Sequence, residues 1–174
     1  MKRSTLLHLR IPFSFFLLPV FLFAWSLYPQ ADLYLTISVF FILHFLVYPA
    51  SNGYKSYYDK AEDSIGGLKE PPKVLKELYY YSLAFDLVAL IWAAIINIWF
   101  AVGILIYGLV SKAYSHPSVR LKKMPYTGWF AAGFFQGYFT FMTVLVGLHG
   151  ISKFDFTDPF VQIPAVLSTL LLFG

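Results

Sequence analysis

Apolar stretches alternate with short polar stretches along the whole chain, a pattern that predicts helices crossing a membrane. The complete spans we expect are residues 11–28, 33–49 and 127–148, together with two helices within 78–110 that a tight turn near Asn97 separates. A further apolar segment, 160–174, would reach about 22 Å as a helix, less than the roughly 30 Å of a hydrocarbon core. We therefore expect an all-α, polytopic bundle in one domain, 1–174, with five complete spans and a partial sixth, truncated at the C-terminus.

The composition agrees with a membrane protein rather than with a soluble domain. Hydrophobic residues make up 59% of the chain and charged residues 13%, which is about half the charged share of an ordinary soluble protein. The chain has no cysteine, and this excludes disulfides, zinc–thiolate sites and iron–sulfur clusters.

The basic residues predict an orientation in the membrane. If the N-terminus is cytoplasmic, every Lys and Arg except Lys153 lies in the N-terminal segment, between spans two and three, or between spans four and five. This bias is typical of cytoplasmic loops. We therefore attribute the net charge of +4 to membrane topology, expect membrane lipid and no nucleic acid as a partner, and place the protein in a cell membrane such as a bacterial inner membrane.

Three carboxylates follow the second span. Asp59, Glu62 and Asp63 would share one face of a helix that continues from that span toward Asp63. Hard oxygen ligands suit Mg²⁺, which usually completes its coordination shell with water and phosphate oxygens. The segment therefore predicts a magnesium site that holds a diphosphate. The alternative is a solvated loop in which these acids form weak ion pairs with neighbours such as Lys55 and Lys60.

A basic loop follows the fourth span on the same predicted membrane face. Arg120, Lys122 and Lys123 come after a proline in the segment 114–123. Arginine binds phosphate oxygens as a planar fork and lysine binds them as a point charge. We expect this loop to clamp the anion while the acidic segment holds the cation. The alternative is an anchor for lipid headgroups.

Asp86 lies near the middle of the third span, and an ionisable residue at that depth is a functional candidate. Its alternative role is structural, with a hydrogen bond to a polar residue of another helix such as Gln136. The remaining polar residues of the spans predict less. We expect His44 to be packed and hydrogen-bonded, Asn97 to serve the turn, and His149 to lie near the outer surface.

With these two loops the chain resembles the UbiA-type prenyltransferase superfamily, which includes 4-hydroxybenzoate polyprenyltransferases. DKAED at 59–63 matches the DxxxD motif that follows the second helix of that family. YSHPSVRLK at 114–122 matches its YSxPxxRLK-like loop after the fourth helix, and LRIPFSFFLLP at 9–19 is similar to its first helix.

The resemblance implies the first half of a nine-helix bundle around a central cavity. Asp59 and Asp63 would bind Mg²⁺ bridging to an isoprenyl diphosphate, and Arg120 and Lys122 would neutralise the departing diphosphate. The allylic cation would then alkylate a lipophilic aromatic or quinone-precursor acceptor. We assign further substrate contacts to the polar residues around the two motifs, namely Asn52, Lys55, Tyr114 and Lys123.

The chain departs from the family pattern at two places. Lys55 stands where the family usually has an Asn, and the second Asp-rich motif would lie beyond residue 174, so the resemblance does not predict full activity for these residues alone. A CDP-alcohol phosphotransferase shares the DxxxD spacing, but its upstream DG…AR run is not found here. A small transporter or a non-catalytic scaffold centred on Asp86 is the third interpretation.

Overall fold

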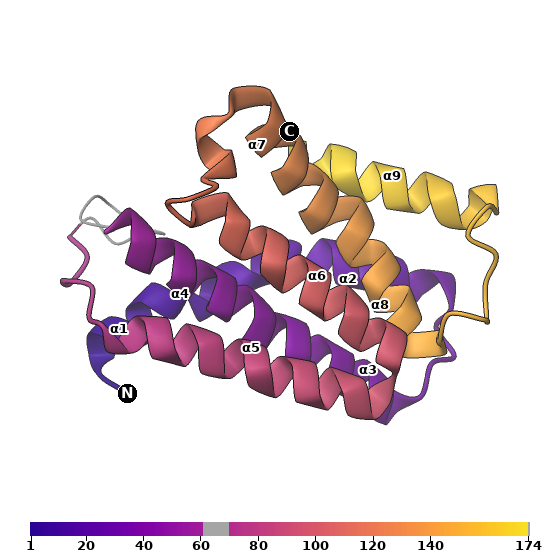
Figure 1. Cartoon of the computed structure of the whole chain (residues 1–174). Coiled ribbons are helices and arrows are strands. Elements are labelled where there is room, and N and C mark those ends of the chain that lie inside the picture. The colour runs from indigo at the N-terminus through magenta and orange to yellow at the C-terminus, as the bar shows by residue number, and fades with distance from the viewer. Residues whose placement is uncertain (61–69, 174) are drawn as a thin grey trace.

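A computed structural model describes residues 1–60 and 70–173, all in helices and their connections. Five helical stretches are long and apolar enough to cross a membrane, as the sequence predicts: Arg3–Leu27, Leu33–Asp59, Glu77–Ile96, Ile98–Ser115 and Pro125–His149. A shorter apolar helix, α9 (Pro159–Phe173), follows them. The protein is therefore helical with several candidate membrane spans in its described part (Figure 1).

Three of the six stretches are assembled from more than one element. The first contains α1 (Arg3–Leu9), the 3₁₀ segment η1 (Ile11–Leu17) and α2 (Leu18–Leu27). The second contains α3 (Leu33–Phe41), the π-helical segment η2 (Ile42–Val47) and α4 (Tyr48–Asp59). The fifth contains α7 (Pro125–Phe134), the π-helical segment η4 (Phe135–Phe139) and α8 (Thr140–His149), while α5 (Glu77–Ile96) and α6 (Ile98–Ser115) are uninterrupted.

The first stretch begins earlier than expected and is broken at Arg10. This residue has a left-handed backbone with φ of 48°, which ends α1 and redirects the chain. Hydrogen bonds tie α1 to the segment before α5. Ser4 Oγ donates to the Lys73 carbonyl at 2.7 Å, His8 Nε2 lies 2.8 Å from the Pro72 carbonyl oxygen, and Thr5 Oγ1 donates to Glu77. The N-terminal helix is therefore fixed against the start of α5.

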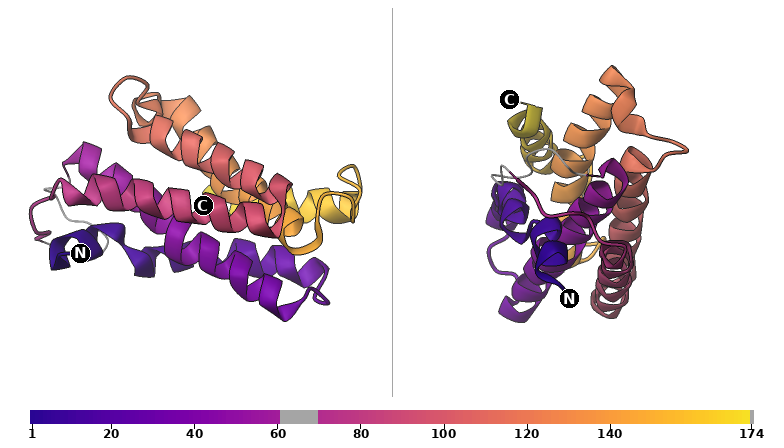
Figure 2. Two further views of the ribbon diagram at one scale, coloured as in Figure 1. Left: turned by 60° about the horizontal axis from the view of Figure 1, so that its bottom comes forward. Right: turned by 90° about the vertical axis from the view of Figure 1, so that its left-hand side faces the viewer.

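Asn97 forms the tight turn that the sequence predicts between the third and fourth spans. Its side-chain oxygen accepts the Trp99 backbone N–H at 2.8 Å, which satisfies one of the free donors at the start of α6. The hairpin of α5 and α6 lies on one side of the bundle, with α2 and α9 on the other side and α4 and α8 between them (Figure 2).

The core lies where α2, α3, α6 and α8 meet. Phe100 and Phe141 are fully buried there, and Gly147 allows the close approach of α6 and α8. A Cβ atom at Gly147 would lie 2.9 Å from the Phe100 ring. By contrast, the outer faces of α5 and α6 expose large aliphatic side chains such as Ile95 and Leu109, which suits contact with lipid chains.

Each π-helical segment contains a residue with an identified hydrogen-bond partner. His44 in η2 is buried among aromatic rings, and its Nδ1 lies 3.1 Å from the Phe40 carbonyl oxygen, so the prediction of a packed, hydrogen-bonded histidine is confirmed. In η4 the Tyr138 backbone N–H donates to Thr169 Oγ1 of α9 at 2.9 Å. Gly137 lies against the backbone of Thr169, and the helix α9 therefore packs directly on η4.

Candidate functional site

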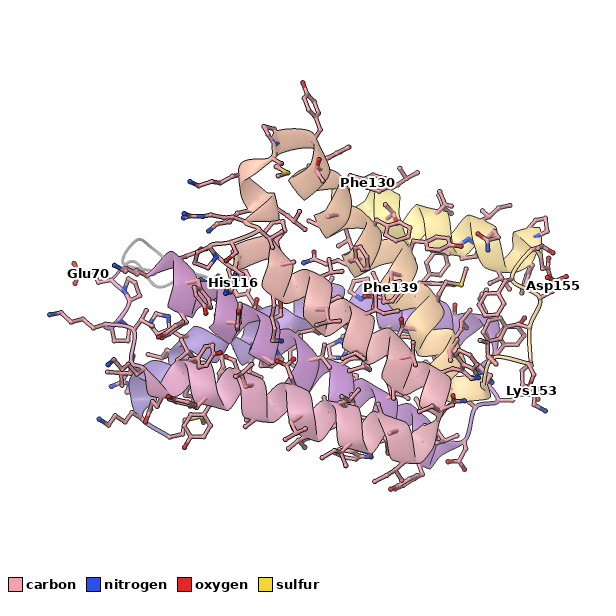
Figure 3. All side chains as sticks on the ribbon, viewed as in Figure 1. Glu70, His116, Phe130, Phe139, Lys153 and Asp155 are labelled. Carbon is pink, nitrogen blue, oxygen red and sulfur yellow. The ribbon has the colours of Figure 1, made fainter. Side chains whose placement is uncertain are left out.

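The two loops that the sequence singles out meet at one end of the bundle. Lys122, in the 3₁₀ segment η3 (Leu121–Lys123), forms an ion pair with Asp59, the last residue of α4. Both side chains keep about a fifth of their surface exposed, 22% for Lys122 and 23% for Asp59. In Figure 3 His116 and Glu70 mark this end, while Lys153 and Asp155 mark the opposite end.

Two residues with left-handed backbone conformation determine where these partners lie. Lys60 has φ of 46° and ends α4 directly after Asp59, and Arg120 has φ of 49° immediately before η3. The prediction that one continuous helix carries Asp59 through to Asp63 is therefore wrong, because the helical turn is broken at Lys60. Glu62 and Asp63 themselves lie outside the described residues.

Basic groups surround Asp59. Its charge acts on Arg10 of the first stretch and on Lys55 one turn earlier in α4. Arg10 Nη2 also donates to Ser56 Oγ at 3.3 Å. Positive charges from three parts of the chain, those of Arg10, Lys55 and Lys122, therefore converge on one carboxylate.

The surroundings of Asp59 provide only part of what a magnesium ion requires. A carboxylate oxygen is the right kind of donor for this ion. Within residues 1–60 and 70–173, however, no three potential His, Cys, Asp or Glu ligands gather in one place. Asp59 thus fits in chemical type, and further carboxylate ligands would have to come from Glu62 and Asp63.

A cavity of about 290 Å³ opens beside this ion pair, between α4, α6 and α7–η4. Three of the predicted substrate-binding residues line it: Asn52, Lys55 and Tyr114. The other lining residues are Ser51, Tyr107, Val110, Ser111, Ser115, Ala131, Ala132, Phe135 and Gln136. Lys55 Nζ lies 5.9 Å from the centre of the Tyr114 ring, a distance at which a cation is attracted to the ring face.

The wall of the cavity joins helices that are far apart in sequence. Ser51 Oγ and Ser111 Oγ lie 2.5 Å apart and connect α4 to α6. Ser115 is 2% exposed, and its hydroxyl oxygen has no hydrogen-bond partner among the residues described. Tyr114 and Ser115 belong to the last turn of α6, although the sequence pattern placed them in the following loop.

The structure does not bring all predicted anion-binding residues into this cavity. Arg120, Lys122 and Lys123 of the loop are not among the residues that line the cavity, and neither is Asp59. Sequence reasoning, for its part, missed Ser51, Ser111 and the cavity position of Gln136. Gln136 could have been identified as a candidate because it is a polar residue within an apolar span. The sequence pattern alone does not show which helix its side chain faces.

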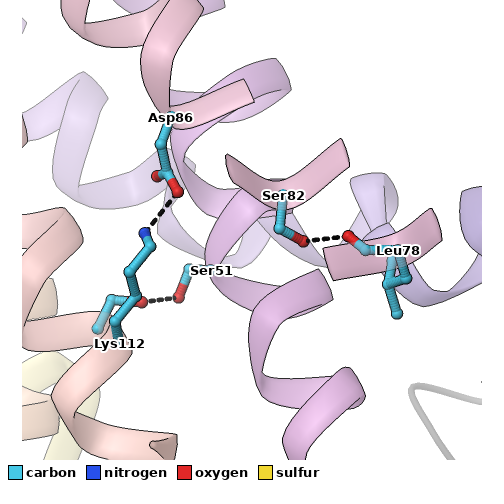
Figure 4. A network of polar contacts seen from close by, with 6 residues as sticks. Ser51, Leu78, Ser82, Asp86 and Lys112 are labelled. Carbon is cyan, nitrogen blue, oxygen red and sulfur yellow. Dashed lines mark hydrogen bonds and ion pairs between the residues drawn. The ribbon is translucent and has the colours of Figure 1, made fainter. Parts of the chain in front are cut away.

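Asp86 lies outside this cavity and has a different partner from the one expected. Its carboxylate forms an ion pair with Lys112 of α6 (Figure 4), whereas Gln136 lines the cavity. Lys112, expected in a cytoplasmic loop, lies within α6. The pair forms because the turn at Asn97 folds α6 back along α5, which brings residues 26 positions apart together.

Comparison with known proteins adds no identification: no family model matches the chain, and no curated protein or solved structure is similar to it.

Proposed function

We propose that this protein is a membrane prenyltransferase that binds an isoprenyl diphosphate with Mg²⁺ beside Asp59 and Lys122. The ion pair between these residues carries the proposal, since it joins the acidic and basic motifs across 63 positions of sequence. A loop that merely anchors the chain to lipid headgroups has no need of a carboxylate partner at the end of another helix. The adjoining cavity supplies space for the transferred group.

The basic residues would act on the leaving group. Breaking the bond between an allylic carbon and a diphosphate oxygen leaves both bonding electrons on the diphosphate, and cations aimed at that oxygen stabilise the charge. Lys122 would exchange Asp59 for a phosphate oxygen when the substrate binds. Lys55, on the cavity wall, would hold a second phosphate oxygen, and Arg120 of the loop would contribute a further positive charge.

The proposed cofactor would act on the diphosphate alone. Mg²⁺ held by Asp59, with Glu62 and Asp63 as further ligands, would neutralise diphosphate charge and assist its departure. Asp59 is released for this role when Lys122 turns to the diphosphate.

The cavity would receive the organic groups. Tyr107, Tyr114 and Phe135 provide aromatic wall, and Val110 and Ala131 provide aliphatic wall. These side chains form the apolar part of a wall that also contains polar residues. Packed against the transferred group, they would limit the access of water, which would otherwise capture the allylic cation. An electron-rich aromatic acceptor, alkylated with loss of a ring proton, is the acceptor class that suits such a cavity.

Calorimetric titration of the purified chain with geranyl diphosphate in the presence of Mg²⁺ tests the proposal. Asp59→Ala should weaken binding by about tenfold, or about 1.4 kcal/mol, since it removes the charged ligand of the partly buried site. Asp155→Ala, at the opposite end of the bundle, is the matched control and should bind as the unchanged chain does. Binding that is absent from the unchanged chain, or that survives Asp59→Ala, would overturn the proposal.

A further inference from the structure

We propose that Asp86, Lys112 and Tyr54 form a positioning junction that sets the separation of α4 and α6 on either side of the cavity. The role of the junction in ligand binding rests on the proposed function, whereas its role in helix separation does not. None of the three residues is among those that line the cavity, so they would act through the helices that carry them.

Lys112 is the centre of the junction. Its ammonium group forms an ion pair with Asp86 of α5 and lies 5.4 Å from the centre of the Tyr54 ring of α4. A cation over the face of an aromatic ring is attracted by the electrons of that face. One side chain of α6 therefore contacts both neighbouring helices, and Figure 4 shows its ion pair with Asp86.

The surroundings make these contacts difficult to replace. Asp86 and Lys112 keep 23% and 20% of their side-chain surface exposed, and this surface opens onto an aliphatic crevice of about 160 Å³ between α5 and α6. Leu87, Leu105 and Leu109 are among the side chains that line the crevice. Because neither leucines nor lipid chains can solvate a charge, each member of the pair depends on the other.

Gly108 provides the space in which the pair meets. A Cβ atom at Gly108 would lie 3.7 Å from Asp86 Oδ1 and 3.9 Å from Lys112 Nζ. These are ordinary contact distances, so a methyl group would just fit whereas a longer side chain would occupy the space of the pair. The small residue thus leaves room for Lys112 to extend back along α6 toward Asp86.

The junction and the cavity wall use the same turns of α4 and α6. Lys112 directly follows Ser111, whose hydroxyl lies 2.5 Å from that of Ser51. Tyr54 lies on α4 less than one turn after Ser51, and Tyr54 is 5% exposed. Any displacement of α6 at Lys112 would therefore move Ser111 and the adjoining wall of the cavity relative to α4.

Disulfide cross-linking measures this separation directly, because the natural chain has no cysteine. Ser51→Cys and Ser111→Cys replace a hydrogen-bonded pair, and a disulfide requires Cβ atoms about 3.5–4.5 Å apart. With Lys112→Met the rate of cross-linking should fall about tenfold, since one change removes both contacts of the junction. Lys112→Arg keeps the charge and should retain most of the rate. Lys153→Met, at the other end of the bundle, is the matched control.

A second variant separates the positioning role from the effect of an unpaired charge. In Asp86→Leu with Lys112→Met no charge remains buried, so the fold should persist while cross-linking stays slow. Normal cross-linking in this double variant would overturn the proposal, whether or not Lys112→Met folds.

Geranyl diphosphate titration of the same variants without the cysteines provides the ligand measurement. The double variant should bind about tenfold more weakly than the chain with both residues intact, because the walls of the cavity are no longer held at their distance. If cross-linking slows but the affinity is unchanged, the junction does not position the ligand site and that part of the proposal is wrong. If the natural chain does not bind the diphosphate, the proposed function is wrong. The cross-linking rates then still test whether the junction sets the separation of α4 and α6.

Discussion

Replacing Lys122 by Met should have opposite effects on the binding of a metal ion and of a diphosphate. The Lys122 ammonium is paired with the Asp59 carboxylate, so a divalent cation must displace it to reach the oxygen atoms. Without the lysine, the cation alone should bind more tightly. The diphosphate should bind less tightly, because it loses a positive contact.

The size of the effect follows from the exposure of the pair. Both side chains are about a fifth exposed, which places the pair near the upper end of the range for partly exposed ion pairs, about 1 kcal/mol. Released from that competition, Asp59 should bind a divalent cation about fivefold more tightly, since about 1.4 kcal/mol corresponds to tenfold. The diphosphate, which loses a charge-assisted contact, should bind about tenfold more weakly.

Electron paramagnetic resonance of free Mn²⁺, used in place of Mg²⁺, measures the metal affinity of the detergent-solubilised protein. Lys123→Met is the matched control, because it removes the same charge from the adjacent, exposed position and should change the affinity less than about twofold in the presence of salt. Weaker Mn²⁺ binding by Lys122→Met, or equally tighter binding by both lysine variants, would contradict the proposed competition at Asp59. In the latter case net charge, rather than the ion pair, would govern the site.

Three further predictions concern the fold. Gly147→Ala should destabilise the protein by about 1–3 kcal/mol, because the new methyl group would lie 2.9 Å from the buried Phe100 ring; an unchanged midpoint of thermal unfolding, followed by tryptophan fluorescence, would contradict this packing. Asn97→Ala removes the cap of α6 and should cost about 1 kcal/mol, whereas Asn97→Asp should retain most of the stability by the same assay. The backbone N–H and hydroxyl of Thr157 donate to Asp155 and lower the pKa of that carboxyl. This contact stabilises the fold above the ordinary pKa of Asp155 and is lost as the pH falls through the lowered one. Thr157→Val should raise the pKa toward its ordinary value, and an NMR titration of Asp155 that shows no change would contradict the assignment.

The candidate site shows how far sequence reasoning extends. The motif residues Asp59 and Lys122 could be singled out because their chemical types and spacing are unusual at the ends of apolar spans. Their ion pair could not be derived in this way, because it depends on where α4 ends and where η3 begins. Left-handed backbone at Lys60 and Arg120 sets these two boundaries. Neither residue is glycine, which is the residue that usually indicates such a conformation in a sequence.

The pairing of Asp86 is the clearest case of a contact that only the folded protein decides. The hydropathy pattern showed that a carboxylate at this position is energetically costly to bury within a span. Which residue pairs with it depends on the register between α5 and α6. Lys112 was expected in a loop because a lysine near the end of an apolar segment usually faces the membrane surface. Its long side chain instead extends back along the helix to Asp86, where the attraction between opposite charges is strong in apolar surroundings.

The helical class, the candidate spans and the turn at Asn97 follow from the amino-acid sequence alone, because these depend on hydropathy and capping within a few neighbouring residues. The tertiary structure decided which polar residues meet: Ser51 with Ser111, Lys122 with Asp59, and Lys112 with both Asp86 and Tyr54. Such contacts join residues that are distant in sequence, and they depend on the lengths, ends and relative rotation of whole helices. Hydrophobic periodicity describes each helix separately, and it carries no information about the side chain that lies opposite on another helix.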